Sequence, residues 1–178
     1  MRNKRTIQIS VSAMFIALVV VATFINVPFP GAAGGLVHLG TLMSLIIAMR
    51  FGKYYGALAG GIGMGLFDVL GGWMAWAPGT FLVRLLIGFA VGLIAHHRIK
   101  GQGASLVLNL IAWAVGLVIM IVGYYLYEAI FLTDFNAALL SIWGNVIQFA
   151  IGLVAPFFVI YLKRIKAIRQ YEKDNDTF

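Results

Sequence analysis

Residues 60–84 read GGIGMGLFDVLGGWMAWAPGTFLVR and define the architecture of the whole chain. The pattern predicts the end of one membrane helix, a short turn, and the start of the next helix. Asp68 and Arg84 flank the turn, and nearly every residue between them is apolar or small. A charge inside the hydrocarbon layer is costly, so it usually faces a partner, a cavity or a ligand. We therefore expect this hairpin to form part of a binding site that opens on the outer side of a membrane.

The composition is that of a membrane protein with several spans. Of the 178 residues, 62% are hydrophobic and only 11% are charged, and the mean hydropathy is +0.97. Soluble domains carry about a quarter charged residues. The length predicts a single domain over residues 1–178. The chain has no cysteine, which excludes disulfides, thiolate metal sites and a cysteine nucleophile.

Six apolar runs follow one another, and we expect each to form a transmembrane helix in a compact all-α bundle. The runs cover residues 9–25, 36–49, 54–72, 78–95, 104–132 and 137–162. Pro156 is expected to kink the sixth run, and the repeated glycines of the third run are expected to permit close helix packing. A signal peptide is the alternative interpretation of the first run, but its length and the spans that follow favour an uncleaved helix.

A long apolar loop rich in proline and glycine, residues 26–35, joins the first two predicted helices. Such a loop either folds over a binding site as a lid or lies on the surface without a further role. The sequence leaves both interpretations open.

The basic residues predict the orientation of the bundle. Of the 13 Lys and Arg residues, 12 fall in the head, in the turns 50–53 and 98–100, and in the tail. Six spans place these four segments on one face, and basic segments stay in the cytoplasm. We therefore expect both termini in the cytoplasm, with a head over residues 1–8 and a basic tail over residues 163–178.

Three charged side chains share the outer third of the predicted membrane layer. At the rise of an α-helix, Asp68 and Glu128 lie about 6 Å below the outer ends of their helices, and Arg84 lies about 9 Å below. A structural pair between Asp68 and Arg84 is one interpretation. A ligand-binding role for at least one of the three charges is the other.

A polar stripe on the sixth run adds further candidates. Ser141, Asn145, Gln148 and Gly152 fall on one helical face. Their amides suit a heterocycle with ring nitrogens and hydroxyls, although hydrogen bonds between helices explain the same stripe. Aromatic side chains lie near the charges and the stripe. The predicted substrate-binding residues are therefore Asp68, Arg84, Glu128, Asn145, Gln148, Tyr124, Tyr125, Trp143 and His38.

No signature of catalysis or ATP binding appears in the sequence. Gly52-Lys53 lacks the rest of a Walker phosphate loop, no Ser-His-Asp spacing or HExxH motif occurs, and a lone His38 is a poor metal ligand. Basic clusters with stacking aromatics, which nucleic-acid binding requires, are absent. An intramembrane enzyme that uses Asp68 and the histidines at 96–97 is disfavoured because these residues are predicted on opposite sides of the membrane. We expect no catalytic residue, no metal and no cofactor.

The motifs VHLG (37–40), YGALAGGIG (55–63), FD (67–68) and APGTF (77–81), with a basic residue at 84, form a recognisable set. This set resembles the substrate-binding S components of energy-coupling factor (ECF) vitamin transporters, in the riboflavin-type and hydroxymethylpyrimidine/pyridoxine-type branch. Many relatives have Asp where Thr41 stands and Lys where Arg84 stands, so the family's substrates do not transfer directly to this chain.

The resemblance implies a subunit of the bacterial plasma membrane that captures a small water-soluble vitamin or precursor. Pyridoxine or hydroxymethylpyrimidine is favoured, with riboflavin and pantothenate as alternatives. It also implies that Ala13 and Ala17, an AxxxA pair, dock on a transmembrane coupling subunit that works with two ABC-type ATPases. The alternative function is a stand-alone carrier driven by protons or sodium, with Asp68 or Glu128 as the relay.

Overall fold

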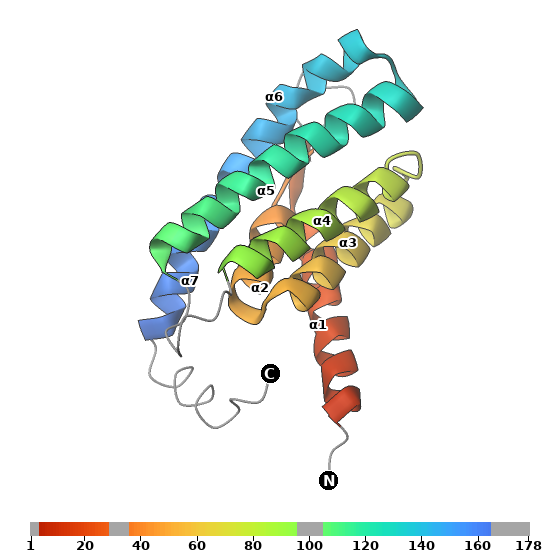
Figure 1. The fold of residues 1–178 in the computed structure, drawn as a ribbon. Coiled ribbons are helices and arrows are strands. Elements are labelled where there is room, and N and C mark those ends of the chain that lie inside the picture. The colour runs from red at the N-terminus through yellow and green to blue at the C-terminus, as the bar shows by residue number, and fades with distance from the viewer. Residues whose placement is uncertain (1–3, 29–35, 96–104, 165–178) are drawn as a thin grey trace.

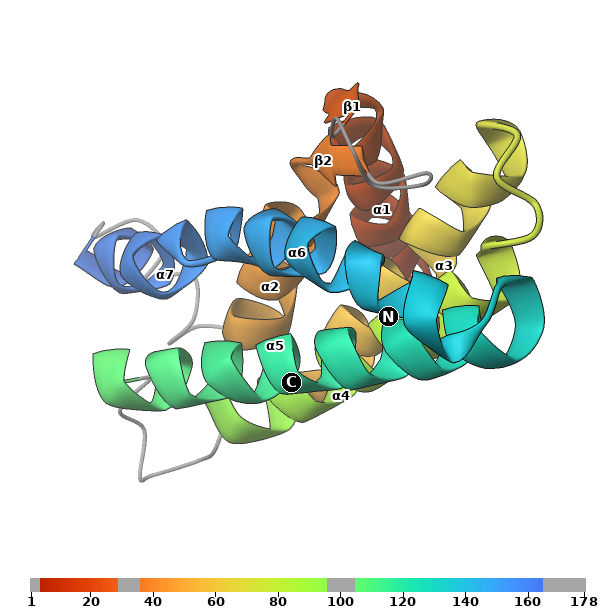
Figure 2. The ribbon, with the colours of Figure 1, turned by 90° about the horizontal axis from the view of Figure 1, so that it is seen from above.

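The computed structural model describes residues 4–28, 36–95 and 105–164 and is almost entirely helical (Figure 1). Its elements in chain order are α1 Lys4–Phe24, β1 Asn26–Pro28, β2 Leu36–His38, α2 Gly40–Phe51, α3 Lys53–Leu70, α4 Ala77–Ala95, α5 Leu106–Tyr127, the π-helical turn η1 Glu128–Leu132, α6 Phe135–Ile151 and α7 Val154–Arg164. Helices α3 and α4 form one hairpin, and α5 packs on α4 and pairs with α6 (Figures 1 and 2). The short α2 lies centrally and contacts α1, α3, α4, α6 and α7.

The helical membrane fold is confirmed, although not every predicted span meets the length and hydropathy of a membrane helix. Four segments of the described chain do so: Lys4–Phe24, Ala77–Ala95, Leu106–Leu132 and Phe135–Leu162. Helix α2 has 12 residues, about 18 Å at the usual rise, which is short of the roughly 30 Å apolar layer. Helix α3 is long enough, but Lys53, Asp68 and its glycines lower its hydropathy. The count of six spans and the side on which the termini lie therefore stay predictions.

The segment between α1 and α2 contains regular structure that the sequence analysis did not predict. Strands β1 and β2 pair antiparallel, with Asn26 opposite His38 and Val27 opposite Val37. The β-branched valines suit a strand, and the Asn26 side chain donates to the Thr23 carbonyl at 3.0 Å where α1 ends. Strand β1 thus occupies the start of the expected loop, and the loop's residues 29–35 lie outside the described part of the chain. The second apolar run was predicted to be helical from residue 36, which is wrong for its first residues: they form β2, and α2 begins at Gly40.

The predicted close packing through glycine is confirmed between α3 and α4. A side-chain carbon placed on Gly88 would collide with the backbone of Gly56, and one placed on Gly92 would collide with the backbone of Lys53. Only a residue without a side chain allows two helix backbones to approach so closely. The glycines therefore fix the spacing and the register of the α3–α4 hairpin.

The predicted kink in the last apolar run is also confirmed. Helix α6 ends at Ile151, five residues before Pro156, and α7 begins at Val154, two residues before it. Proline cannot donate to the carbonyl four residues earlier, which is that of Gly152, and its ring obstructs a straight helix. The Trp113 side chain of α5 donates its indole N–H to the Phe149 carbonyl at 3.1 Å, beside the break.

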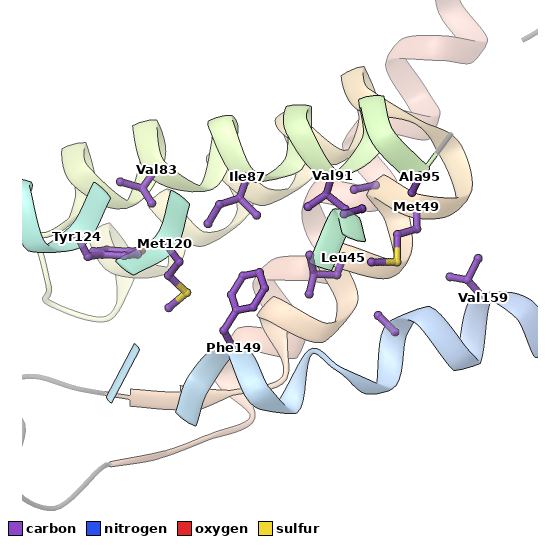
Figure 3. Close-up of a cluster of buried hydrophobic side chains, with 13 residues drawn as sticks. Leu45, Met49, Val83, Ile87, Val91, Ala95, Met120, Tyr124, Phe149 and Val159 are labelled. Carbon is purple, nitrogen blue, oxygen red and sulfur yellow. The ribbon is translucent and has the colours of Figure 1, made fainter. Parts of the chain in front are cut away.

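The apolar core connects the two hairpins and ends at the polar residues described below. Leu45 and Met49 of α2 pack with Val83, Ile87 and Val91 of α4, with Phe149 of α6 and with Val159 of α7 (Figure 3). Met120 and Tyr124 of α5 belong to the same cluster. The hydroxyl of Tyr124 forms hydrogen bonds with polar side chains, so this residue marks the boundary between the core and the cavity.

Candidate functional site

A cavity of about 90 Å³ lies where β2, α3, α4, α5, η1 and α6 meet. Its wall consists of Leu36, His38, Phe67, Asp68, Trp73, Trp76, Thr80, Arg84, Met120, Tyr124, Glu128, Ser141, Gly144, Asn145 and Gln148. The wall includes seven of the nine residues predicted to bind substrate. The expected convergence of acidic, cationic and amide groups from separate helices on one cavity is therefore confirmed, whereas their binding of a substrate stays a prediction.

Arg84 of α4 is the buried cation of the cavity, with only 4% of its surface exposed. Its Nε donates to the Tyr124 hydroxyl at 3.2 Å, and its Nη1 donates to the Thr41 hydroxyl at 3.0 Å. Both partners are neutral, and within the described residues Arg84 forms no ion pair with a carboxylate. A buried charge without a direct ion pair is costly, so Arg84 is suited to receive an acceptor group from a ligand.

Asp68 of α3 lies at the other end of a short chain of polar groups. The Tyr124 hydroxyl, which receives the Arg84 bond, donates to the Thr80 hydroxyl at 3.2 Å, and Thr80 lies beside the Asp68 carboxyl. One oxygen of that carboxyl, Oδ2, is buried and has no hydrogen-bond partner in the described structure. The direct Asp68–Arg84 ion pair considered from the sequence is thus not formed, and the two charges are linked through neutral hydroxyls.

Gln148 of α6 joins the cavity to the ribbon. Its Oε1 accepts from the backbone N–H of His38 at 2.8 Å, and its Nε2 donates to the His38 carbonyl at 2.9 Å and to the Thr41 hydroxyl at 2.6 Å. Thr41 also receives the bond from Arg84. One connected set of hydrogen bonds therefore extends from β2 through Gln148, Thr41, Arg84 and Tyr124 to Thr80.

Glu128 occupies the position where α5 changes into the π-helical turn. Its carbonyl accepts from the N–H of Thr133 at 2.8 Å, five residues later, which is the bond that defines a π-helix. The side chain is buried at 5% exposure and lies beside Ser141 of α6. Turns of this kind are frequent at functional sites, and this one holds an acidic group in the cavity wall.

Two predicted residues do not belong to the cavity wall. Trp143 is 71% exposed on α6, and Tyr125 lies half-buried, with its hydroxyl 3.5 Å from the Phe135 carbonyl. Asn145 is half-buried and does line the cavity, whereas Gly152 of the predicted stripe packs against Leu45 instead.

The structure adds residues that the sequence analysis did not single out as binding candidates. Thr41 and Thr80 supply the hydroxyls of the hydrogen-bonded set, and Trp73 and Trp76 belong to the wall. The turn holds its tryptophans in place because the N–H of Trp73 donates to the Asp68 carbonyl at 2.7 Å and that of Trp76 donates to the Trp73 carbonyl at 2.9 Å. Trp73 and Trp76 lie close to Asp68 in the sequence, and this closeness was the signal from which their place in the wall could have been predicted.

The predicted docking residues lie away from the cavity. Ala13 and Ala17 are one turn apart on α1, and both are exposed. Small exposed residues at this spacing leave room for another helix to approach. Their role in docking stays a prediction.

Comparison with known proteins gives one coherent result. The model of the family described as ECF-type riboflavin transporter, S component, matches residues 3–166. An uncharacterized protein of Pyrococcus woesei is 27% identical over 143 residues, which cover 78% of this chain and 88% of that protein. The thiamine precursor transporter HmpT of Lactococcus lactis is 23% identical over 155 residues, 86% of each chain. The solved structure of the S component of a bacterial ECF transporter superposes with a TM-score of 0.64 at 19% identity and covers 94% of this chain and 99% of its own.

Proposed function

The chain belongs to the S component family of ECF-type riboflavin transporters, and from this premise we propose that it captures a small single-ring vitamin or vitamin precursor. S components are the substrate-binding membrane subunits of vitamin transporters and are not enzymes. They work with an ECF module of transmembrane and ATPase subunits.

The chemistry of the wall supports a flat heterocycle that carries both donors and acceptors. Arg84 offers donor groups, while Asp68 and Glu128 offer acceptors, and all three line one cavity. Trp73 and Trp76 add aromatic surface, on which a planar ring can pack. The observation that carries the proposal is the buried Oδ2 of Asp68, which has no partner in the described structure, because an unmatched buried acceptor is satisfied when a ligand donates to it.

The size of the cavity favours a single ring over three fused rings. A volume of about 90 Å³ is well below the roughly 300 Å³ at which sites for drug-sized ligands begin. The relative named as a thiamine precursor transporter supports the same choice. We therefore place hydroxymethylpyrimidine and pyridoxine before riboflavin on size, and before the acyclic pantothenate because Trp73 and Trp76 offer aromatic surface to a planar ring.

In this proposal the chain crosses the membrane six times, with both termini in the cytoplasm. Helix α2 serves as a span despite its shortness and α3 despite its low hydropathy, because both are packed against other helices. Helix α3 also lines the cavity. Ala13 and Ala17 dock on a transmembrane coupling subunit, which works with two ABC-type ATPases. A tryptophan at both positions is expected to abolish uptake and to leave vitamin binding unchanged.

Binding to the purified chain tests the substrate. Trp73 and Trp76 supply an intrinsic fluorescence signal at the cavity, and Trp76→Phe is a control that identifies the source of the signal. Hydroxymethylpyrimidine and pyridoxine are expected to change the fluorescence at submicromolar concentration, and riboflavin and pantothenate only at much higher concentration. Mass spectrometry of ligand that co-purifies with the chain gives an independent identification. Tight binding of riboflavin or pantothenate alone would refute the choice of a single-ring substrate.

Vesicles that contain only this chain test the stand-alone carrier, in which Asp68 or Glu128 relays an ion. We expect binding without accumulation under a proton or sodium gradient. Accumulation that follows the gradient would show that the chain transports without its coupling partners.

A further inference from the structure

We propose that Gln148 is a positioning residue that pins strand β2 to helix α6 and thereby holds one wall of the cavity in place. The inference rests on the proposed function only where ligand release is measured. The movement of the ribbon can be measured without any ligand.

The contacts of Gln148 imitate those of a neighbouring strand. Its amide accepts from the N–H of His38 and donates to the carbonyl of the same residue, at 2.8 and 2.9 Å. The orientation of the amide is set by these partners, because the reversed amide would place N–H against N–H and oxygen against oxygen. A single side chain thus takes up both backbone groups of His38, which a third strand would otherwise engage.

Gln148 has little capacity left for a ligand. An amide nitrogen carries two protons, and those of Gln148 are used by the His38 carbonyl and the Thr41 hydroxyl. The side chain is 2% exposed. Asn145, three residues earlier on the same helix, is half-buried, lines the same cavity and has no side-chain hydrogen bond within the described structure. Asn145 is therefore available to a ligand, whereas Gln148 is committed to the protein.

The pinned strand forms part of the cavity wall. Leu36 and His38 of β2 both line the cavity, and in the described structure β2 pairs with β1 alone. Without Gln148 the ribbon loses its hydrogen bonds to α6. The ribbon then moves away from α6 more readily, and a bound ligand escapes more often.

The first test measures the distance between the ribbon and α6 in the ligand-free chain. Native cysteine is absent, so spin labels can be attached at Val27→Cys on β1 and Leu140→Cys on α6, which are 67% and 69% exposed in the native chain. In Gln148→Met, which keeps the length of the side chain but loses both bonds to His38, we expect a broader distribution shifted to longer distances. Asn145→Ala is the matched control and is expected to keep the native distribution. An unchanged distribution in Gln148→Met overturns the proposal.

A second variant covers the case in which Gln148→Met does not fold. Gln148→Leu removes the acceptor and both donors with a smaller apolar side chain, and it is also expected to broaden the distribution. An unchanged distribution in this variant overturns the proposal in the same way.

The second test measures the release of a bound vitamin, with hydroxymethylpyrimidine and pyridoxine as probes. Loss of two hydrogen bonds predicts a dissociation rate about tenfold higher in Gln148→Met, with an association rate close to the native one. A large fall in the association rate alone would show that Gln148 guides the ligand directly and would contradict the positioning role. If neither probe binds the native chain, the proposed substrate fails, and the distance measurement still decides the role of Gln148.

Discussion

Two neighbouring faces of helix α4, one toward α3 and one toward the cavity, differ in what they contact. On the face toward α3 the backbones touch, because Gly88 and Gly56 lie against each other and Gly60 meets the backbone carbonyl of Arg84. On the neighbouring face, one and two turns before Gly88, Arg84 and Thr80 extend into a cavity bordered by α5 and α6. The difference shows that a cavity needs a rigid support: the glycine contact fixes the backbone of Arg84, so that its side chain can be held in a polar space.

The largest expected effect comes from filling the glycine contact. In Gly88→Leu the side chain would overlap the backbone of Gly56, and neither backbone can move without disturbing the hairpin. We expect no folded, monodisperse protein in size-exclusion chromatography. Leu86→Ala on the same helix, where the native residue is 55% exposed, is the control and should behave like the native chain. A stable Gly88→Leu protein would mean that α3 and α4 are not in backbone contact.

The next largest effect is expected in the cavity. Arg84→Met removes the buried cation and should weaken vitamin binding by a factor of about 100, because charged hydrogen bonds in buried sites are strong. Arg84→Lys keeps the charge but loses the planar donor group that reaches both Tyr124 and Thr41, so an intermediate loss is expected. Titration by tryptophan fluorescence measures both. Native affinity in Arg84→Met would remove Arg84 from the ligand site.

A smaller effect is expected at Asp68. Asp68→Asn keeps the shape of the side chain and removes its charge, and we expect about tenfold weaker binding with little change in thermal stability. The double variant Asp68→Asn with Arg84→Met measures whether the two charges interact. The two charges form no direct ion pair in the described structure, but the hydroxyls of Tyr124 and Thr80 link them, so the two losses of folding free energy should deviate from additivity. Strictly additive losses would show that the linking hydroxyls carry no coupling.

The smallest effect is expected where the two faces meet, at Gly60. A side-chain carbon there would lie 3.1 Å from the Arg84 carbonyl oxygen, which requires a shift of a few tenths of an ångström. Gly60→Ala should fold and bind a few-fold more weakly, as measured by the same titration. Unchanged affinity would show that the position of the Arg84 backbone is not set by α3.

Much of the fold follows from local rules that act within one segment of sequence. The apolar runs predict the helices, Pro156 predicts the break before α7, and the glycines predict the contact between α3 and α4. The ribbon was not predicted because its pairing depends on two short segments brought together by tertiary structure. The same reason applies to the hydroxyls of Thr41 and Thr80, whose role depends on partners about 40 residues away.

The two residues outside the cavity wall illustrate a rule that was available from the sequence. Trp143 lies two residues from Asn145, which is about 200° around a helix. Tyr125 is one residue, or about 100°, past Tyr124. Helical periodicity alone thus directs Trp143 away from the face that carries the cavity residues, whereas Tyr125, about 60° from Glu128, lies at the edge of that face. No such rule predicts that Trp73 and Trp76 face the cavity, because they lie in a turn and a turn has no fixed periodicity.

The interruption between α6 and α7 has more than one cause. Pro156 excludes a straight helix. Two further contacts act at the same place: the indole of Trp113 donates to the Phe149 carbonyl, and Gly152 packs on Leu45. Exchanging the proline for a residue that favours helices would therefore leave the bend in place. The packing of the whole bundle sets the angle between α6 and α7. A substitution at position 156 alone is therefore expected to leave this angle unchanged.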